Sequence, residues 1–376
     1  MNPPNYASAT IDELQQHLAS VILPLWATRG FNGALGLPYD AIAPSEQPPL
    51  PPTRYRAMAC ARQLYVFSAG GWHDHADRLF ESLRTRFADA THGGWHYSID
   101  AHGTPHETQK DLYTHAFIVF GCAEYFRHRG NRDALELLEA TLHVIETRFA
   151  AGAGLYNAVL SKDFRTIADG PRQNPIMHLA EAYLSARDVR RDAGFSDALE
   201  RIGEQMIATF VHRPTGCIAE LPIGRGTLRI EPGHQFEWSY LVSSAPDVFG
   251  RSGLSAWLDS AYAFALRHGV SPITGGVCAA LDEHGHTTDQ TERLWAQTEF
   301  ARALATSHAI RGATSASGDI PLDAQFGRFR QRFLRNYGWV ESIAPDGTVI
   351  RADMPSTTPY HMMTMYRAIA RLQAES

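Results

Sequence analysis

The chain has 376 residues, of which 44% are hydrophobic and 20% charged, a balance that allows a large core and excludes an intrinsically disordered protein. Aspartate and glutamate (40) outnumber lysine and arginine (34), so the formal net charge is −6. This charge argues against a protein that follows nucleic-acid phosphates or binds an anionic membrane surface. The 18 histidines, 7 tryptophans and 14 tyrosines are suited to proton transfer near neutral pH and to contact with sugar rings.

The N-terminal residues and the cysteines bear on the compartment. The first ten residues contain no lysine or arginine and no apolar run of the kind found in a signal peptide. The longest apolar stretch, at residues 116–123, is too short to span a membrane. The four cysteines are scattered without a C-x-x-C motif, which predicts reduced thiols. We therefore expect a cytoplasmic protein.

A repeat of about 61 residues runs through the chain. Glycine-containing turns recur at intervals of 60 to 62 residues, from Gly33 in GFNGAL to Gly338 in YGWVESI. The turns between them contain Gly94, Gly154, Gly216 and Gly276. A period of this size is typical of an architecture in which each repeat is one supersecondary unit.

Each repeat unit is predicted to contain a short β-hairpin followed by two helices. In the second unit, residues 95–100 alternate and lead into a polar turn at 100–103, as in a hairpin. Residues 110–128 are apolar nearly all round, which predicts a helix enclosed by others. Residues 134–145 carry a single apolar stripe and predict an outer helix.

Six such units predict an all-α fold, an (α/α)6 barrel of six helical hairpins with short β-hairpin excursions at one end. An open solenoid is the alternative, but it needs polar capping repeats. The last unit, with Tyr360, Met362 and Met363, does not resemble a cap. We expect the barrel to be a single catalytic domain over residues 1–376.

A cluster of polar and aromatic residues stands at the start of each predicted inner helix. If all inner helices start at one end, the clusters share one cavity, and six helix N-termini point their free N–H groups at a polyhydroxylated ligand. The clusters are Thr53–Arg56, Asp111–His115, Arg172–His178, Glu231–Trp238, Arg293–Glu299 and Thr358–His361.

Histidines recur in these clusters, at His115, His178, His234 and His361. The repetition of one titratable residue type favours acid–base chemistry over separate packing roles. A metal site is the alternative, but the chain has no H-E-x-x-H motif and no carboxylates spaced as a ligand set with these histidines. Nucleotide-phosphate motifs are also missing from the sequence. We therefore expect neither a metal nor an organic cofactor.

Five segments together resemble the N-acylglucosamine 2-epimerase superfamily: KDLYTHAF, RQNPIMHLAEA, EPGHQFEW, RLWAQTE and STTPYH. The resemblance extends from Arg54 to His361 and implies an (α/α)6 barrel. It also implies two catalytic histidines, which His234 and His361 match. The implied sugar-binding positions are matched by Arg54, Asn174, His178, Glu237, Trp295 and Gln297. Tyr113, His115 and Glu299, from the same clusters, complete the predicted binding set.

The RLWAQTE segment bears on the choice within this superfamily, which includes N-acetylglucosamine and cellobiose 2-epimerases, mannose isomerases and sulfoquinovose-type isomerases. A single Trp295 followed by Gln297-Thr298-Glu299 is more similar to the mannose isomerases than to the double-tryptophan pattern of the epimerases. The resemblance therefore favours an isomerase that interconverts D-mannose and D-fructose. A 2-epimerase of the N-acylglucosamine or cellobiose type remains the alternative. We expect a monosaccharide substrate and a monomer or homodimer.

The expected chemistry moves a proton from C2 to C1 through an enediol, a task that suits imidazole. We expect His361 to carry this proton and His234, oriented by Glu237, to open the ring and to move hydroxyl protons. Arg54 would stabilise the enediolate oxygen. The sequence does not decide which histidine takes which role.

Two other classes of function stay open. A glycoside hydrolase needs two carboxylates flanking the scissile bond, for which Glu231, Glu237 and Glu299 are the candidates, but a histidine-rich site fits this chemistry poorly. A non-catalytic binding protein would not need four histidines at helix starts.

Overall fold

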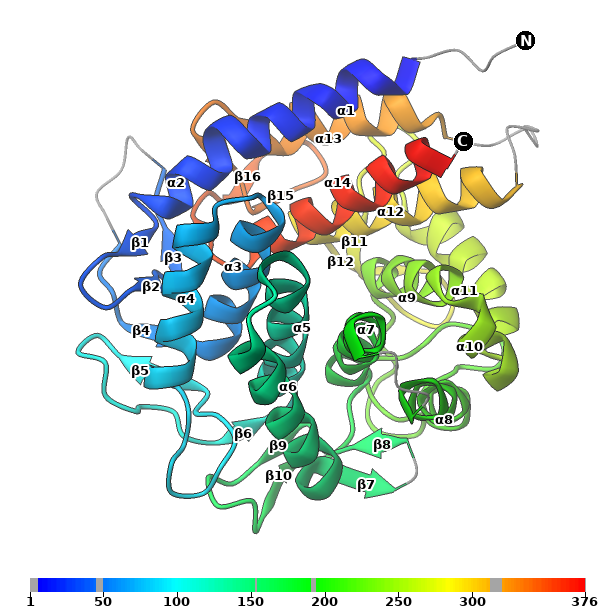
Figure 1. Cartoon of the computed structure of the whole chain (residues 1–376). Helices are drawn as coiled ribbons and strands as arrows, with labels where there is room; N and C mark the ends of the chain where they lie inside the picture. The colour runs from blue at the N-terminus through cyan, green and yellow to red at the C-terminus, as the bar shows by residue number, and fades with distance from the viewer. Residues whose placement is uncertain (1–5, 45–49, 153, 191–193, 312–319, 376) are drawn as a thin grey trace.

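The computed structural model describes residues 6–44, 50–152, 154–190, 194–311 and 320–375. Within these ranges, six helices form an inner ring and the remaining helices surround it (Figure 1). The inner helices are α3 (Ala57–Ala69), α5 (Leu112–Arg129), α7 (Gln173–Arg190), α9 (Pro232–Ser244), α12 (Leu294–Arg311) and α14 (Thr358–Glu375). The outer elements are α1 (Tyr6–His17) with η1 (Leu18–Ile22) and α2 (Leu23–Ala27), α4 (His73–Arg86), α6 (Arg132–Val144) with η2 (Ile145–Phe149), α8 (Gly194–Thr209), α10 (Pro246–Ser252) with α11 (Leu254–Gly269), and α13 (Leu322–Phe333).

The inner ring is closed. Each inner helix contacts the next one in chain order, and α14 returns to contact α3. The outer helices α4, α6, α8, α11 and α13 pack against α3, α5, α7, α9 and α12 respectively, while α1 lies against α13 and α14. The predicted (α/α)6 barrel is confirmed.

Sequence patterns explain the difference between inner and outer helices. Inner helix α5 buries Leu112 and every residue from Thr114 to Tyr125, as its all-round apolar sequence predicts. The Asp111 side chain caps this helix by accepting a hydrogen bond from the Thr114 N–H at 2.7 Å. Outer helix α6 buries only one stripe, which includes Ala134 and Leu138. The two patterns together sort the helices into layers.

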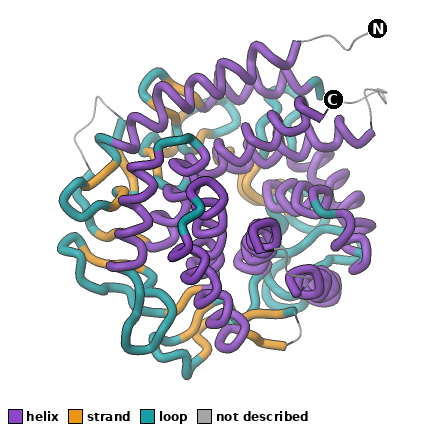
Figure 2. The backbone as a smooth tube through the Cα atoms, viewed as in Figure 1, coloured by secondary structure: helices purple, strands orange, loops and turns teal. Residues whose placement is uncertain are grey.

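The strands lie in the loops that precede the inner helices (Figure 2). Antiparallel pairs join neighbouring units, and the pair formed by β17 and β3 joins the last unit to the first. The pairs between units are β4 (Arg54–Arg56) with β5 (Ser98–Asp100), β6 (Lys110–Asp111) with β9 (Val159–Leu160), β12 (Thr287–Arg293) with β15 (Ser342–Ile343), and β17 (Met354–Pro355) with β3 (Ala41–Ile42). The pairs within a unit are β1 (Phe31–Asn32) with β2 (Leu37–Pro38), β7 (Ala150–Gly152) with β8 (Leu155–Tyr156), β9 with β10 (Ile167–Asp169), β11 (Cys278–Leu281) with β12, β13 (Leu334–Arg335) with β14 (Gly338–Trp339), and β15 with β16 (Val349–Arg351).

The opposite end of the barrel, where the inner helices finish, is rich in arginine. Arg127, Arg302, Arg367 and Arg371 line a cavity of about 260 Å³ there. Cations at helix C-termini are stabilised by the helix dipoles, and Glu124 accepts hydrogen bonds from both Arg127 and Arg367. Arg302, from the middle of α12, is paired instead with Glu299 at 2.9 Å and Glu181 at 3.5 Å. No helix in the described part of the chain is long and apolar enough to cross a membrane.

Candidate active site

A second cavity, of about 250 Å³, lies at the end where the inner helices begin. Each of the six inner helices contributes at least one side chain from its N-terminal half. The lining residues are Arg62, Tyr113, Asn174, His178, Glu220, Glu231, His234, Glu237, Arg293, Trp295, Glu341, Thr357, Thr358 and His361. We call this space the N-terminal cavity.

The structure brings seven of the eleven predicted site residues into the N-terminal cavity. Residues from repeat units far apart in sequence therefore meet, as the closed ring requires. The seven are Tyr113, Asn174, His178, His234, Glu237, Trp295 and His361.

Two predicted binding residues lie away from the cavity lining and have other partners. Arg54, on β4, donates a hydrogen bond to Glu107 at 2.6 Å and keeps a third of its side chain exposed. His115 is fully buried between helices, where its Nδ1 lies 2.8 Å from the Asp111 carbonyl oxygen and its Nε2 accepts from the Trp95 N–H at 3.3 Å. Both assignments therefore need correction: Arg54 joins neighbouring strands, and His115 is a core residue with both ring nitrogens hydrogen-bonded.

Two more predicted binding residues act from behind the cavity wall. Gln297 accepts a hydrogen bond from the Val277 N–H at 2.9 Å and donates to the Val277 carbonyl at 3.1 Å, so it fixes a loop to α12. Glu299 is fully buried and meets His361 Nδ1 at 2.9 Å. Neither residue lines the cavity, and Glu299 supports a residue that does.

Arg62 is a buried cation that lines the cavity and that the sequence prediction missed. Its guanidinium donates to the Tyr113 hydroxyl at 2.6 Å and lies over the rings of Phe117 and Tyr360 at 4.0 and 4.7 Å. Arg62 is only 3% exposed, and its Nε has no protein partner. An arginine inside the largely apolar helix 57–69 was the available sequence signal, because arginine is rarely buried unless it is paired with another group.

His234 is held as a cation. Its Nδ1 lies 2.7 Å from Glu220, whose two oxygens also accept hydrogen bonds from Gln173 Nε2 at 3.1 and 3.0 Å. Burial works against the charged ring, but Glu220, followed by Glu231 and Glu237, outweighs it and raises the pKa of His234 to about 9. Glu220 therefore orients His234, where the sequence prediction had assigned this role to Glu237.

His361 is held as a neutral ring. Burial, followed by the positive charges of Arg62 and Arg302, lowers the pKa of His361 well below its ordinary value. Glu299 accepts a hydrogen bond from Arg302 at 2.9 Å through one oxygen and meets His361 Nδ1 through the other. With the His361 proton on Nδ1 and directed at Glu299, the Nε2 lone pair is left as a base.

Trp295 stands beside both imidazoles. Its ring centroid is 4.9 Å from that of His234 and 5.9 Å from that of His361. A Cβ at Gly233 would come within 2.7 Å of the Trp295 ring, so α9 and α12 approach this closely only because residue 233 is glycine. The indole thus places both histidines along one wall of the cavity.

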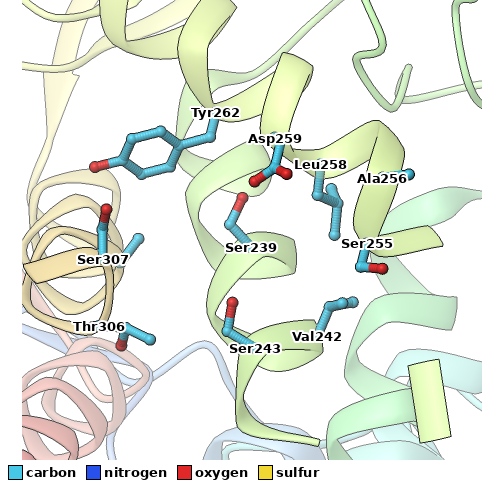
Figure 3. A pocket seen from close by; sticks show the side chains of 11 residues that line it. Ser239, Val242, Ser243, Ser255, Ala256, Leu258, Asp259, Tyr262, Thr306 and Ser307 are labelled. Atoms are coloured by element: carbon cyan, nitrogen blue, oxygen red, sulfur yellow. The ribbon is translucent and has the colours of Figure 1, made fainter. Parts of the chain in front are cut away.

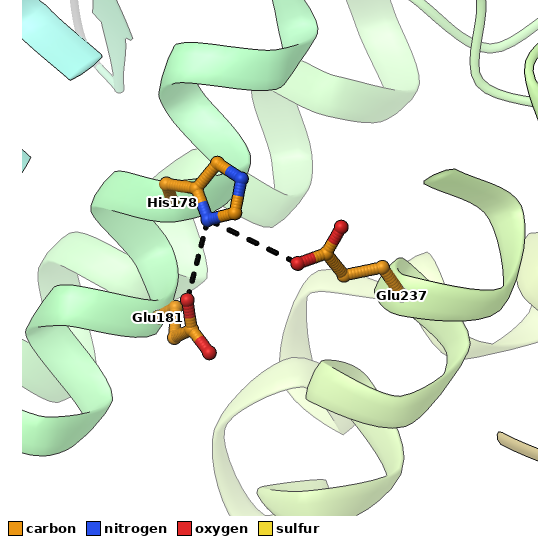
Figure 4. Close-up of side chains that lie close together, drawn as sticks. All are labelled: His178, Glu181 and Glu237. Carbon is orange, nitrogen blue, oxygen red and sulfur yellow. Dashed lines mark hydrogen bonds and ion pairs between the residues drawn. The ribbon is translucent and has the colours of Figure 1, made fainter. Parts of the chain in front are cut away.

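Glu237 and His178 form the floor, with Glu181 behind them (Figure 4). Burial, followed by the charges of Glu299 and Glu181, raises the pKa of Glu237 well above its ordinary value. Burial lowers the pKa of His178 to about 4, against the opposing effect of Glu181. Both Glu237 oxygens, like Asn174 Oδ1, are buried without a protein hydrogen-bond partner. Such atoms fit a ligand that brings many hydroxyl groups.

Glu341 adds a titratable group at the other side of the cavity, before α14. One of its oxygens accepts hydrogen bonds from Trp339 Nε1 at 3.0 Å and from the Thr358 hydroxyl at 2.8 Å. Burial raises the pKa of Glu341 to about 7. Nothing in the sequence repeat distinguished this glutamate, because its position depends on a hairpin from the last unit.

A different cavity, of about 280 Å³, opens between α9, α11 and α12 (Figure 3). Its wall consists largely of small hydroxyl side chains, including Ser239 and Ser243, with Asp259 and Tyr262. None of its eleven lining residues is a histidine, so it lacks the acid–base groups of the N-terminal cavity. We therefore place the chemistry in the N-terminal cavity.

Comparison with known proteins agrees with this architecture. Residues 46–365 match the family model described as N-acylglucosamine 2-epimerase (GlcNAc 2-epimerase). A Rhizobium meliloti protein named mannose-6-phosphate isomerase is 25% identical, with coverage of 93% of this chain and 94% of the relative. A cellobiose 2-epimerase of Bacteroides fragilis is also 25% identical, with coverage of 93% and 95%. The crystal structure of a D-mannose isomerase shares the fold, with a TM-score of 0.84 over 100% of both chains at 18% identity.

The fold and these relatives define a sugar isomerase or epimerase. The chain belongs to the N-acylglucosamine 2-epimerase family.

Proposed function

We propose that the chain acts as one catalytic domain, an aldose–ketose isomerase that interconverts D-mannose and D-fructose. The observation that carries this proposal is the pair of imidazoles around one cavity, His234 with a raised pKa and His361 with a lowered one. A protonated and a neutral imidazole at one substrate are the acid and the base that an enediol mechanism needs.

The size of the cavity supports a free monosaccharide. A volume of about 250 Å³ is below the ~300–1,000 Å³ of cavities that hold drug-sized ligands, which disfavours a disaccharide such as cellobiose. One relative is named mannose-6-phosphate isomerase, and an assay of D-mannose beside its 6-phosphate distinguishes the two substrates.

The proton on carbon moves through His361. Its Nε2 removes the C2 proton of the open-chain aldose and returns it to C1, while Glu299 keeps the ring oriented through Nδ1. The enediolate that forms in between carries negative charge on oxygen. Arg62, buried and fixed by Tyr113, stabilises that charge in a site largely closed to water.

The protons on oxygen move through His234. As an imidazolium it donates a proton to the ring oxygen when the pyranose opens. As the ring opens, it takes up the proton that leaves the O1 hydroxyl. In the isomerisation it then protonates O1 and takes up the proton released from O2, so the number of protons on the enzyme is unchanged after each turnover. Glu220 stabilises the cationic state of His234 throughout.

Incubation with D-mannose in D₂O, followed by NMR, tests the proposal. Fructose as the first product is the expected result, with the hydrogen from C2 transferred to C1 and deuterium there only to the extent that the proton on His361 exchanges with solvent before it is returned. Glucose as the first product would replace the proposal with a 2-epimerase, the activity named for the Bacteroides fragilis relative. Absence of turnover on D-mannose and on other free aldoses would overturn both.

A further inference from the structure

His178 and Glu237, which line the N-terminal cavity, form a compact group of potential metal ligands with Glu181 behind them (Figure 4). His178 and Glu181 are three residues apart on α7, so they lie on one face of the helix, and Glu237 reaches them from α9. His178 Nδ1 is 3.2 Å from Glu181 Oε2 and 3.9 Å from Glu237 Oε1. One ligand atom from each residue lies within 4.8 Å of the others.

Glu237 supplies an independent sign of a ligand at this place. The residue is 1% exposed, and neither of its carboxyl oxygens has a protein hydrogen-bond partner. Buried carboxyl groups are normally hydrogen-bonded or paired, because leaving one without a partner costs several kcal/mol. A cation bound between Glu237 and His178 would supply the missing partner.

We propose that His178, Glu181 and Glu237 bind a divalent transition-metal ion of the Zn²⁺ type. A tetrahedral Zn²⁺ ion with bonds of about 2.0–2.2 Å separates its ligand atoms by about 3.3–3.6 Å. Two of the three ligand separations, 3.2 and 3.9 Å, bracket this range, and the third is within 4.8 Å, so side-chain rotations are needed to complete the site. The fourth position faces the sugar cavity, which His178 and Glu237 line.

The protons balance when the metal binds. In the metal-free protein, His178 Nδ1–H donates to Glu181; on binding, this proton moves to Nε2 and frees the Nδ1 lone pair. Glu237 binds the metal as a carboxylate, and a proton that it carries in the metal-free protein goes to solvent. Glu181 is already ionised, because Tyr360 donates to Oε2 and Arg302 lies 3.5 Å from Oε1.

Two neighbouring groups of ligand types are poorer sites. Glu220, Glu231 and His234 lie close together, but His234 carries a proton on the nitrogen that faces Glu220. Glu237, Glu299 and His361 form the other group, in which Glu299 is bound closely by Arg302 at 2.9 Å and a metal would take the His361 nitrogen that faces Glu299, whereas Arg302 lies 3.5 Å from Glu181.

Metal binding would compete with the sugar, and this part of the inference rests on the proposed function, which gives His178 and Glu237 to sugar hydroxyls. Binding itself is independent of that function. The two parts are therefore measured separately, first with Zn²⁺ and no sugar, then with Zn²⁺ as an inhibitor of D-mannose turnover.

Titration calorimetry of the chelator-treated full chain with ZnCl₂ is the test. We expect one site whose affinity falls more than about 10-fold in Glu237→Gln and in Glu181→Gln, since even outer-shell changes cost metal sites ~10–100-fold. These substitutions keep the side-chain shape and remove a charge. In an active enzyme, Zn²⁺ should raise the KM for mannose and leave kcat unchanged.

A matched control is His286→Ala, which removes the exposed histidine that contacts Asp282 at 3.0 Å and should leave the affinity unchanged. The proposal is overturned if the parent shows no Zn²⁺ site, if His286→Ala abolishes it, or if Glu299→Gln weakens binding while Glu181→Gln does not. An inactive protein that binds Zn²⁺ through Glu181 and Glu237 would contradict the proposed function and leave the metal site in place.

Discussion

The α9 and α14 walls of the cavity contain the same two residue types and hold them in opposite states. On each wall a histidine Nδ1 meets a glutamate, at 2.7 Å for His234 and Glu220 and at 2.9 Å for His361 and Glu299. Burial disfavours the charged ring on both walls. Yet the pKa of His234 is raised to about 9, and the pKa of His361 is lowered well below its ordinary value.

The difference comes from what surrounds each pair. Around His234 the neighbouring charges are carboxylates, and Glu231 and Glu237 add to the effect of Glu220. Around His361 the neighbours Arg62 and Arg302 are cations, and Arg302 already neutralises Glu299. Two similar pairs thus become an acid and a base through the second layer of charges.

Removal of either imidazole is expected to have the largest effect. His361→Ala and His234→Ala should each lower kcat on D-mannose by about 10²–10⁴-fold, the usual contribution of a general acid or base. Steady-state kinetics measures the loss, and circular dichroism checks the fold. The surface variant His286→Ala is the control. Turnover within tenfold of the parent in either cavity variant would show that the acid–base pair lies elsewhere.

The sequence predicted the barrel because its evidence was periodic. Six turns at five similar intervals indicate six similar units, and helices that are apolar all round must lie inside. Proximity of His234 and His361 follows from closure of the ring, which makes position along the chain unimportant. The sequence did not predict which way a polar side chain faces. His115 and His361 are each the fourth residue of an inner helix, yet they face different surroundings.

The charged residues that surround the two histidines could not be predicted from the sequence. Glu220 reaches His234 from the loop between α8 and α9, and the repeat gives this loop no distinctive position. The resemblance was matched to Arg54, in the cluster before the first inner helix, whereas Arg62, further along in α3, lies inside the cavity. A charge on an apolar helix was the better signal, since burial of an unused guanidinium is costly.

Arg62→Gln tests the cation that makes the surroundings of His361 differ from those of His234. Loss of an enediolate-stabilising group should lower kcat by about 10²–10³-fold, the scale found for donors to developing oxyanions. Arg54→Gln is the matched control and should stay within about threefold, because Arg54 bonds to Glu107 outside the cavity. Kinetics on both variants distinguishes the residues, and the reverse ranking would restore the original assignment to Arg54.

Glu220→Gln should make His234 more like His361, that is, a neutral ring rather than an imidazolium. The protonated His234 is the active form, so activity is lost as pH rises through its pKa of about 9. Without Glu220 this pKa falls to about 7 or below, and kcat at pH 8 should drop about tenfold relative to its value at the optimum. The pH profile of kcat gives the shift. Glu299→Gln should lower kcat without moving this basic limb, and an equal shift in both variants would contradict the separate roles.

His115→Gln is expected to have the smallest effect on catalysis, with kcat within about twofold, because His115 lies outside the cavity. Its effect is on stability. Loss of the hydrogen bonds to Asp111 and Trp95 should cost about 1–3 kcal/mol at pH 7.5.

The pH dependence of that stability separates His115 from the catalytic histidines. Burial lowers the pKa of His115 to about 3, so the folded protein keeps this ring neutral while the unfolded chain binds a proton below about pH 6.5. The stability that neutral His115 contributes is therefore present above pH 6.5 and is lost as pH falls from 6.5 toward 3. Between pH 7.5 and 5 the parent should lose about 2 kcal/mol more than His115→Gln. Urea denaturation at the two pH values measures this difference, and equal losses would show that His115 is protonated in the folded state.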